Sequence, residues 1–325
     1  MTISCGLHKT GSSAIQVALK HQLRAERVMV PVSGQPFDLS DVRQKIRSLP
    51  NDGVYADEHL FGTALDGYAS LPKYVQQLNS ALDERPARII FCVRPHVRWL
   101  ESLYVQLIMM GENVTAREFI DGIELSPWVN WADMYDFIRL ATSSSDVLML
   151  PYNPAHDMTI EFLDLLEVPY SRRKVRRMGR VNRSLPPARA KLLQIAMSSG
   201  VLTKSEVVAS RAALQSLPSR TMAEWSSILP ESIQQLIIDK HKKQWAILST
   251  CRNLDSRCRA AFEAIDSEAA YAIKPYVGDT LQSPELGDEA DFLFGEGARV
   301  FASHKRMRSP VPRLLKAVRQ IFEGG

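Results

Sequence analysis

A lysine, two glycines and three hydroxyl residues are crowded into residues 6–13, which read GLHKTGSS. An apolar run precedes them and the patterned segment AIQVALKHQL follows, which predicts a strand, a glycine-containing turn and a helix. Such a turn presents backbone N–H groups at the helix N-terminus, where phosphate or sulfate binds favourably. The alternative is a plain strand–helix turn that Ser12 or Ser13 caps, with Lys9 solvated. The expected contacts of a bound anion are Gly6, His8, Lys9, Thr10, Gly11, Ser12 and Ser13.

The residue order distinguishes this loop from a Walker A loop, which reads GxxxxGK followed by Ser or Thr. Here Lys9 precedes the second glycine, Gly11. The sequence therefore does not strongly predict that a hydroxyl after the lysine coordinates Mg²⁺, although Thr10 is kept as an alternative ligand. We expect no metal site.

A second candidate site lies in the segment RIIFCVRPHVRWLESLYVQL. Its apolar run predicts a strand that ends at Arg94, followed by a helix whose first turns carry Arg98 and Ser102. Open parallel sheets bind ligands at the carboxyl ends of their strands, where an arginine can hold a phosphate bidentately and a serine can add a hydrogen bond. The alternative is that Arg98 pairs with Glu101 and that Ser102 is an ordinary residue of the helix surface.

Five short apolar runs with helical patterns between them predict the elements that position these residues: TISCGL, RVMVPV, GVYADE, RIIFCV and DVLMLPY. This alternation is typical of an α/β fold, a three-layer parallel sheet flanked by helices. After about residue 152 the strand patterns fade and helical ones remain. We predict a domain over residues 1–250 and a helical, partly irregular C-terminal extension over residues 251–325.

Composition and charge exclude several classes of protein. A net charge of +4 on 325 residues is far from the density of a dedicated nucleic-acid binder. No stretch approaches the roughly 20 apolar residues that span a bilayer, and the N-terminal segment has no signal-peptide pattern. Two of the four cysteines, Cys5 and Cys92, lie in strand-like runs and are expected to be buried thiols. We therefore expect a cytoplasmic protein.

Together, the two anion-binding segments resemble those of sulfotransferases that use 3′-phosphoadenosine 5′-phosphosulfate as donor. GLHKTGSSAIQ is similar to the family's 5′-phosphosulfate loop, and VRPHVRWLESLY is similar to its 3′-phosphate motif, including the eight-residue offset from Arg94 to Ser102. The family typically has Arg-x-Pro, whereas this chain has Arg-Pro directly. The resemblance implies a nucleotide-kinase-like fold of the P-loop type, the donor as co-substrate and no required metal.

The resemblance also implies in-line transfer of a sulfuryl group to an acceptor hydroxyl or amine. Lys9 would then neutralise charge on the transferring group. The segment GVYADEHLFG places Glu58 and His59 where a third strand ends, beside the edge that carries Lys9 and Arg94. Since several relatives use a glutamate as general base, Glu58 is the first candidate, His59 the second and His8 the third. The alternative is that Glu58 is a solvated residue at a strand end.

A third segment is strongly basic, with seven Lys or Arg residues between Arg172 and Arg183. Its VNRSL stretch is similar to one in bacterial sulfotransferases that helps to cover the nucleotide. This likeness implies polar contacts from Asn182 and Ser184, and a contact between Arg180 or Arg183 and an anionic group. The alternative is a solvated basic loop with Ser184 capping the next helix. Binding of nucleic acid is disfavoured because no aromatic residues interleave with the charges.

The acceptor is expected to be a glycan or another hydroxyl compound, because many relatives modify carbohydrates. The C-terminal segment predicts an amphipathic basic helix with Leu314, Val318 and Ile321 on its apolar face. This helix could contact the inner membrane peripherally, although packing against protein is the commoner use of such a face. Two other functions stay open: an ATP-dependent kinase with a variant phosphate loop, and a non-catalytic nucleotide-binding scaffold.

Overall fold

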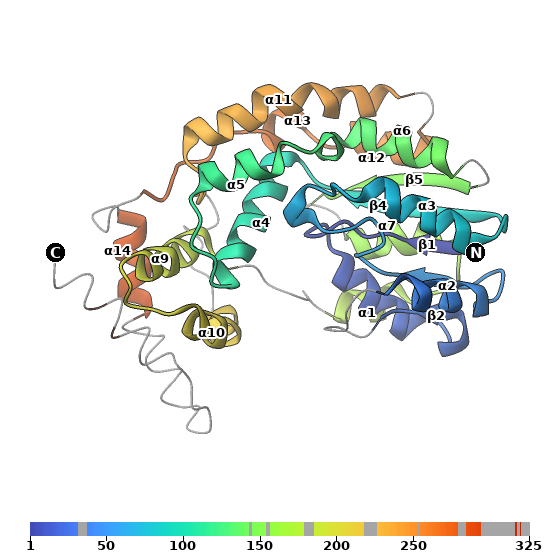
Figure 1. The fold of residues 1–325 in the computed structure, drawn as a ribbon, viewed down its shortest axis with the longest axis horizontal. Helices are drawn as coiled ribbons and strands as arrows, with labels where there is room; N and C mark the ends of the chain where they lie inside the picture. The colour runs from blue at the N-terminus through green and yellow to red at the C-terminus, as the bar shows by residue number, and fades with distance from the viewer. Residues whose placement is uncertain are drawn as a thin grey trace. The chain divides into compact units, whose positions relative to one another are not determined.

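Five strands form one parallel sheet in the order β2-β3-β1-β4-β5 (Figure 1). The computed structural model describes residues 1–31, 38–142, 145–153, 157–178, 185–217, 226–251, 254–278 and 284–293, together with Lys316 and Arg319. Each strand overlaps one of the five predicted segments, which confirms the α/β class. The strands are β1 (Thr2–Ser4), β2 (Val28–Met29), β3 (Val54–Ala56), β4 (Ala87–Val93) and β5 (Ser145–Pro151).

Helices flank the sheet, which is why its strands read as nearly continuous apolar runs. Helix α1 packs against α7, which follows the last strand, whereas α2 and α6 both pack against α3. The helices of this part of the chain are α1 (Ser12–Gln22), α2 (Leu39–Ser48), α3 (Leu71–Leu82), α4 (His96–Met109), α5 (Ala116–Ile123), α6 (Trp131–Ala141) and α7 (Met158–Leu165), with short 3₁₀ helices η1 (Ala25–Arg27), η2 (Ala64–Asp66) and η3 (Pro127–Val129).

The rest of the described chain is helical, as predicted. Its helices are α8 (Arg172–Arg177), α9 (Pro187–Ser198), α10 (Lys204–Ser216), α11 (Glu231–Thr250), α12 (Ser256–Glu263), α13 (Ser267–Ala270) and α14 (Pro284–Phe292). No helix among the described residues is both long and apolar enough to span a bilayer. The predicted basic amphipathic helix at the C-terminus lies outside the described residues, except for Lys316 and Arg319.

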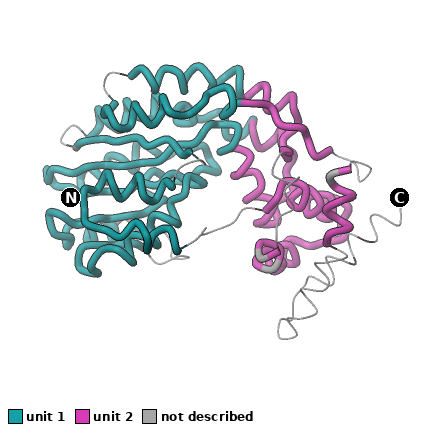
Figure 2. Tube along the Cα trace, turned by 180° about the vertical axis from the view of Figure 1, so that it is seen from behind, with its two compact units in different colours: residues 1–99, 121–182, 238–271 teal, residues 100–120, 183–237, 272–325 magenta. Residues whose placement is uncertain are grey.

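The chain divides into two compact units, which Figure 2 colours separately. Unit 1 comprises residues 1–99, 121–182 and 238–271 and contains the whole sheet. Unit 2 comprises residues 100–120, 183–237 and 272–325, and its described elements are helices apart from one isolated β-bridge between Ser227 and Tyr276. The predicted functional division at residue 250 stays a prediction.

Unit 2 contains a buried ion pair between two of its helices. Arg189 of α9 donates from Nε to Glu289 of α14 over 2.6 Å, and its Nη1 donates to the Leu214 carbonyl over 2.8 Å. The two charged side chains are 1% and 3% exposed. Such a pair is valuable mainly because loss of either partner would leave a buried charge uncompensated.

In unit 1, the start of α4 is held by a buried histidine. His96 lies with Nε2 2.8 Å from the Val129 carbonyl and with Nδ1 3.1 Å from the Tyr271 hydroxyl. The neutral ring satisfies both partners, because Nε2–H donates to the carbonyl and Nδ1 accepts from the hydroxyl. Its faces stack on Trp131 and His241, with centroids 4.8 and 4.0 Å away. Burial therefore lowers the pKa of His96 well below its ordinary value.

The state of His96 predicts that acid weakens unit 1. In the unfolded chain, His96 takes up a proton below about pH 6.5, whereas the folded ring stays neutral, so the free energy of unfolding falls as the pH falls through that window. When the pH falls from 7.5 to 5.5, this histidine lowers the free energy of unfolding by about 1.4 kcal/mol. Urea unfolding at the two pH values should show this loss in wild type and a smaller loss in His96→Gln. The exposed His21 gives the control, since His21→Gln should behave like wild type. Equal losses in all three proteins would contradict the assignment.

Two predicted buried thiols are confirmed. Cys5 follows β1 and Cys92 lies within β4, and both are buried and unpaired. Burial raises the pKa of each thiol, so neither is a ready nucleophile.

Candidate functional site

The candidate site lies at the carboxyl ends of β1 and β4. From β1 the chain continues to β2, on one side in the sheet, whereas from β4 it continues to β5, on the other side. Neighbouring strands whose connections leave in opposite directions open a crevice beyond their carboxyl ends. The opening loop follows β1 and Arg94 follows β4, so the topology brings both predicted anion-binding segments to this crevice.

The backbone of the loop forms a concave set of amides. Lys9 and Gly11 have positive φ angles of 66° and 90°, whereas Thr10 between them does not. Alternation of this kind turns successive N–H groups toward one point, as in anion-binding nests. The amides of Thr10, Gly11 and Ser12 belong to this turn and to the N-terminus of α1. A non-glycine residue at positive φ costs about 1–2 kcal/mol, so Lys9 holds a strained backbone conformation in this loop.

The hydroxyl groups of Thr10 and Ser12, both predicted donors to an anion, already have acceptors within the protein. The buried Thr10 hydroxyl donates to the Leu7 carbonyl over 2.5 Å, and Ser12 donates to Glu58 Oε2 over 2.6 Å. Because a hydroxyl has one proton to donate, these two residues would contact an anion through their backbone amides. Their side chains hold the loop in shape.

Gly6 permits a close approach of strand and helix. A Cβ atom on Gly6 would lie 2.5 Å from Cβ of Ser12, well inside van der Waals contact. Ser12 is the first residue of α1, so this contact determines where the helix N-terminus stands relative to β1.

Arg94 and the loop are connected through Tyr152. β4 and β5 pair in register up to Val93 and Pro151, which places Arg94 beside Tyr152. The Arg94 guanidinium carbon lies 5.0 Å from the centre of the Tyr152 ring, and a Cβ on Gly11 would lie 3.9 Å from that ring. Tyr152 therefore lies between the two predicted segments. The sequence analysis did not assign it a role, although it ends the last predicted strand.

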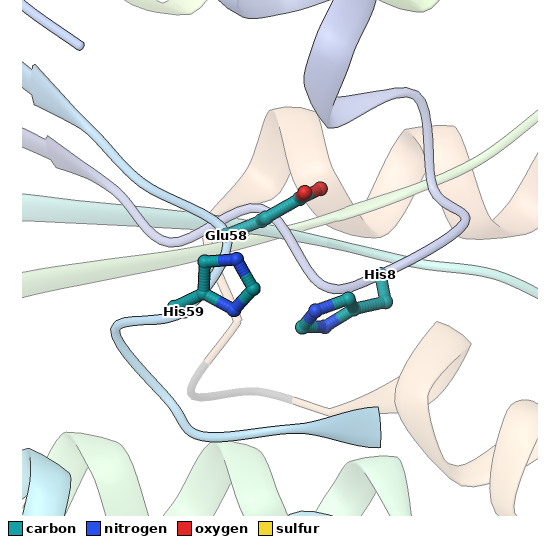
Figure 3. Close-up of side chains that lie close together, drawn as sticks. All are labelled: His8, Glu58 and His59. Atoms are coloured by element: carbon teal, nitrogen blue, oxygen red, sulfur yellow. The ribbon is translucent and has the colours of Figure 1, made fainter. Parts of the chain in front are cut away.

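Figure 3 shows His8, Glu58 and His59 close together, one from the opening loop and two from the turn after β3. Their ligand atoms all lie within 4.8 Å of one another, and the two imidazole centroids are 5.1 Å apart. The predicted base candidates therefore form one cluster beside the loop. Glu58 and His8 are half-buried and His59 is exposed.

Backbone hydrogen bonds hold this cluster in place. The His8 amide donates to the Tyr68 hydroxyl over 3.1 Å, and the His8 carbonyl accepts from Trp99 Nε1 over 3.0 Å. Asp57 is buried and accepts from the His59 amide over 2.9 Å, which shapes the turn that carries Glu58.

The electrostatic environment of the cluster keeps His8 neutral. Burial lowers the pKa of His8 to about 4, and the nearby Lys9 adds to that effect while Glu58 opposes it. Burial also raises the pKa of the Asp57 carboxyl. Within the described chain, the buried Nδ1 atom of His8 has no hydrogen-bond partner, which costs about 1–3 kcal/mol if nothing else satisfies it.

For the remaining predicted site residues, the structure shows fewer contacts, or the residues lie outside the described chain. Arg98 and Ser102 are four residues apart in α4 and so share one face of that helix. Ser102 belongs to unit 2, and its predicted contact with the donor stays a prediction. Glu101 accepts from the Ser227 hydroxyl over 2.6 Å. Arg180, Asn182 and Ser184 lie outside the described residues.

The chain was compared with protein-family models, curated proteins and solved structures. No protein-family model, no curated protein and no solved structure matches the chain. The fold is an α/β fold with a five-stranded parallel sheet, and its function rests on the site itself.

The close contact at Gly6 predicts that a glycine-to-alanine substitution destabilises the protein at position 6 but not at position 122. Gly6→Ala must push Ser12 and the start of α1 away from β1, so we expect a loss of about 1–3 kcal/mol in the free energy of unfolding. Gly122→Ala is the matched control, because a Cβ there meets nothing within 4 Å and alanine favours the helix that contains it. Thermal unfolding of both variants measures the difference. Equal stability of Gly6→Ala and wild type would contradict the prediction, because α1 could then move away from β1 without loss of stability.

Proposed function

We propose that the chain is a sulfotransferase that moves a sulfuryl group from 3′-phosphoadenosine 5′-phosphosulfate to an acceptor hydroxyl, most readily one on a carbohydrate. The observation that carries this proposal is the juxtaposition, across Tyr152, of a concave amide loop and an arginine at one crevice. A donor with phosphate groups at two positions needs two such anion-binding features. The resemblance of both segments to sulfotransferase motifs supports the same assignment.

The residues of the crevice fit the donor chemically. The amides of Thr10, Gly11 and Ser12 and the Lys9 ammonium would bind the phosphosulfate, since a helix N-terminus and a cation both favour an anion. Arg94 would bind the 3′-phosphate while its guanidinium lies over the Tyr152 ring. Arg98, in the first turn of α4, would extend that second contact.

The transfer step needs a base and a stabilised leaving group. In this mechanism the acceptor oxygen attacks the sulfur, its proton passes to the Glu58 carboxylate, and the bond from sulfur to the bridging oxygen breaks. Lys9 neutralises the charge that develops on that oxygen, which leaves with the 5′-phosphate. Ser12 donates to one oxygen of Glu58 and so leaves the other oxygen for the acceptor proton.

Ligand binding tests the donor assignment. We expect adenosine 3′,5′-bisphosphate alone to raise the melting temperature, and Arg94→Ala to weaken its binding by about tenfold or more, because an arginine–phosphate contact is charge-assisted. Arg24→Ala is the control, since Arg24 is exposed and remote from the crevice in sequence. Isothermal calorimetry measures both affinities. Stabilisation by ATP with Mg²⁺ but not by the bisphosphate would favour a kinase instead.

Turnover tests the two catalytic assignments. With radiolabelled donor and a panel of carbohydrate acceptors, Glu58→Gln should lower kcat by about 10²–10⁴-fold, the usual contribution of a general base, while bisphosphate binding persists. Lys9→Ala should lower kcat as well, whereas Lys20→Ala, an exposed change on α1, should not. The kcat of His59→Gln tests the second base candidate, and it should stay near that of wild type if Glu58 is the base. Full turnover in Glu58→Gln would remove Glu58 from its role, and bisphosphate binding with no transfer to any acceptor would indicate a scaffold.

A further inference from the structure

We propose that His8, Glu58 and His59 form a binding site for a divalent transition-metal ion, with zinc as the best fit. The three side chains offer two imidazole nitrogens and one carboxylate oxygen within 4.8 Å of one another. Two histidines and a glutamate are the protein ligands of one group of catalytic zinc sites, which leave the remaining position to water or substrate. Imidazole ligands favour zinc and its neighbours over Mg²⁺ or Ca²⁺.

The fold brings the ligands together from two neighbouring strands. β1 and β3 pair side by side, and the Asp57 amide donates to the Ser4 carbonyl over 3.0 Å, which joins the two strand ends just before the ligands begin. His8 is anchored through both of its backbone groups, whereas His59 is exposed at the rim. In a tetrahedral zinc site, neighbouring ligand atoms stand about 3.4 Å apart. The ligand atoms, which lie within 4.8 Å of one another here, would therefore approach one another further when an ion binds.

Two further observations point to a ligand at this place. The buried Nδ1 atom of His8 has no hydrogen-bond partner in the described chain, and such an atom needs a water, an ion or a substrate group. Ser12 donates to Glu58 Oε2 over 2.6 Å, which orients the carboxylate and leaves Oε1 to coordinate. Metal-binding carboxylates are commonly held in this way by a second residue.

The metal site does not depend on the proposed transfer reaction. It is built from side chains on one flank of the loop, whereas the donor would be bound by backbone amides, Lys9 and Arg94. Because a carboxylate that holds the ion cannot also take the acceptor proton, zinc binding and sulfuryl transfer would exclude each other at Glu58.

Equilibrium dialysis of the full chain against Zn²⁺ alone, without nucleotide and with a phosphine reductant present, tests the site. We expect His59→Ala, a change at an exposed residue, to weaken zinc binding by more than about tenfold, the loss that even outer-shell changes cause. Glu58→Gln should do the same, and Ser12→Ala should weaken binding by about tenfold. His21→Ala, at an exposed histidine on α1, is the control and should bind zinc like wild type.

Cobalt substitution identifies the ligands independently of affinity. Co²⁺ held by two imidazoles and a carboxylate should give a visible absorption band without the near-ultraviolet charge-transfer band of thiolate ligands, and the visible band should vanish in His59→Ala. The cysteines are thereby distinguished from the proposed site. No zinc binding by wild type, or undiminished binding in both His59→Ala and Glu58→Gln, would overturn the proposal and would leave the test of donor binding unaffected.

Discussion

The site depends on how closely the N-terminus of α1 approaches the end of β1. Gly6 has no side chain, so Ser12 can lie against it, and the helix begins directly above the strand end. From that position Ser12 reaches Glu58 on the neighbouring β3 turn. One close contact thus places the loop amides, the carboxylate and the two histidines of the cluster within one small region.

The parallel sheet makes this arrangement possible. Strands that run the same way deliver their following loops to one edge, and the order β2-β3-β1-β4-β5 puts the strand that carries the opening loop in the centre. The turn after β3 then lies on one flank of the loop and Arg94 lies on the other. The first flank carries the Glu58 carboxylate and the His59 imidazole, and the second carries the Arg94 guanidinium beside the Tyr152 ring.

Buried polar groups in unit 1 are matched to a single protonation state. His96 serves both of its partners as a neutral ring, and His8 is held neutral by burial beside a lysine. A neutral His8 keeps a lone pair that can bind a metal ion at ordinary pH. The same burial lowers the stability of the unit in acid, because these histidines bind protons in the unfolded chain but stay neutral in the folded chain.

The sequence by itself determined the α/β class, the five strands and the loop, since apolar periodicity and glycine spacing are local properties of the chain. It also placed Lys9, Glu58 and Arg94 at strand ends, and therefore at one edge. It could not show that Tyr152 lies between Arg94 and Gly11, nor that Thr10 and Ser12 use their hydroxyl protons internally, because these contacts join residues far apart in the chain or depend on a particular φ angle. Only the tertiary structure brought His8 to Glu58 and His59, since strand order and register decide which loops become neighbours.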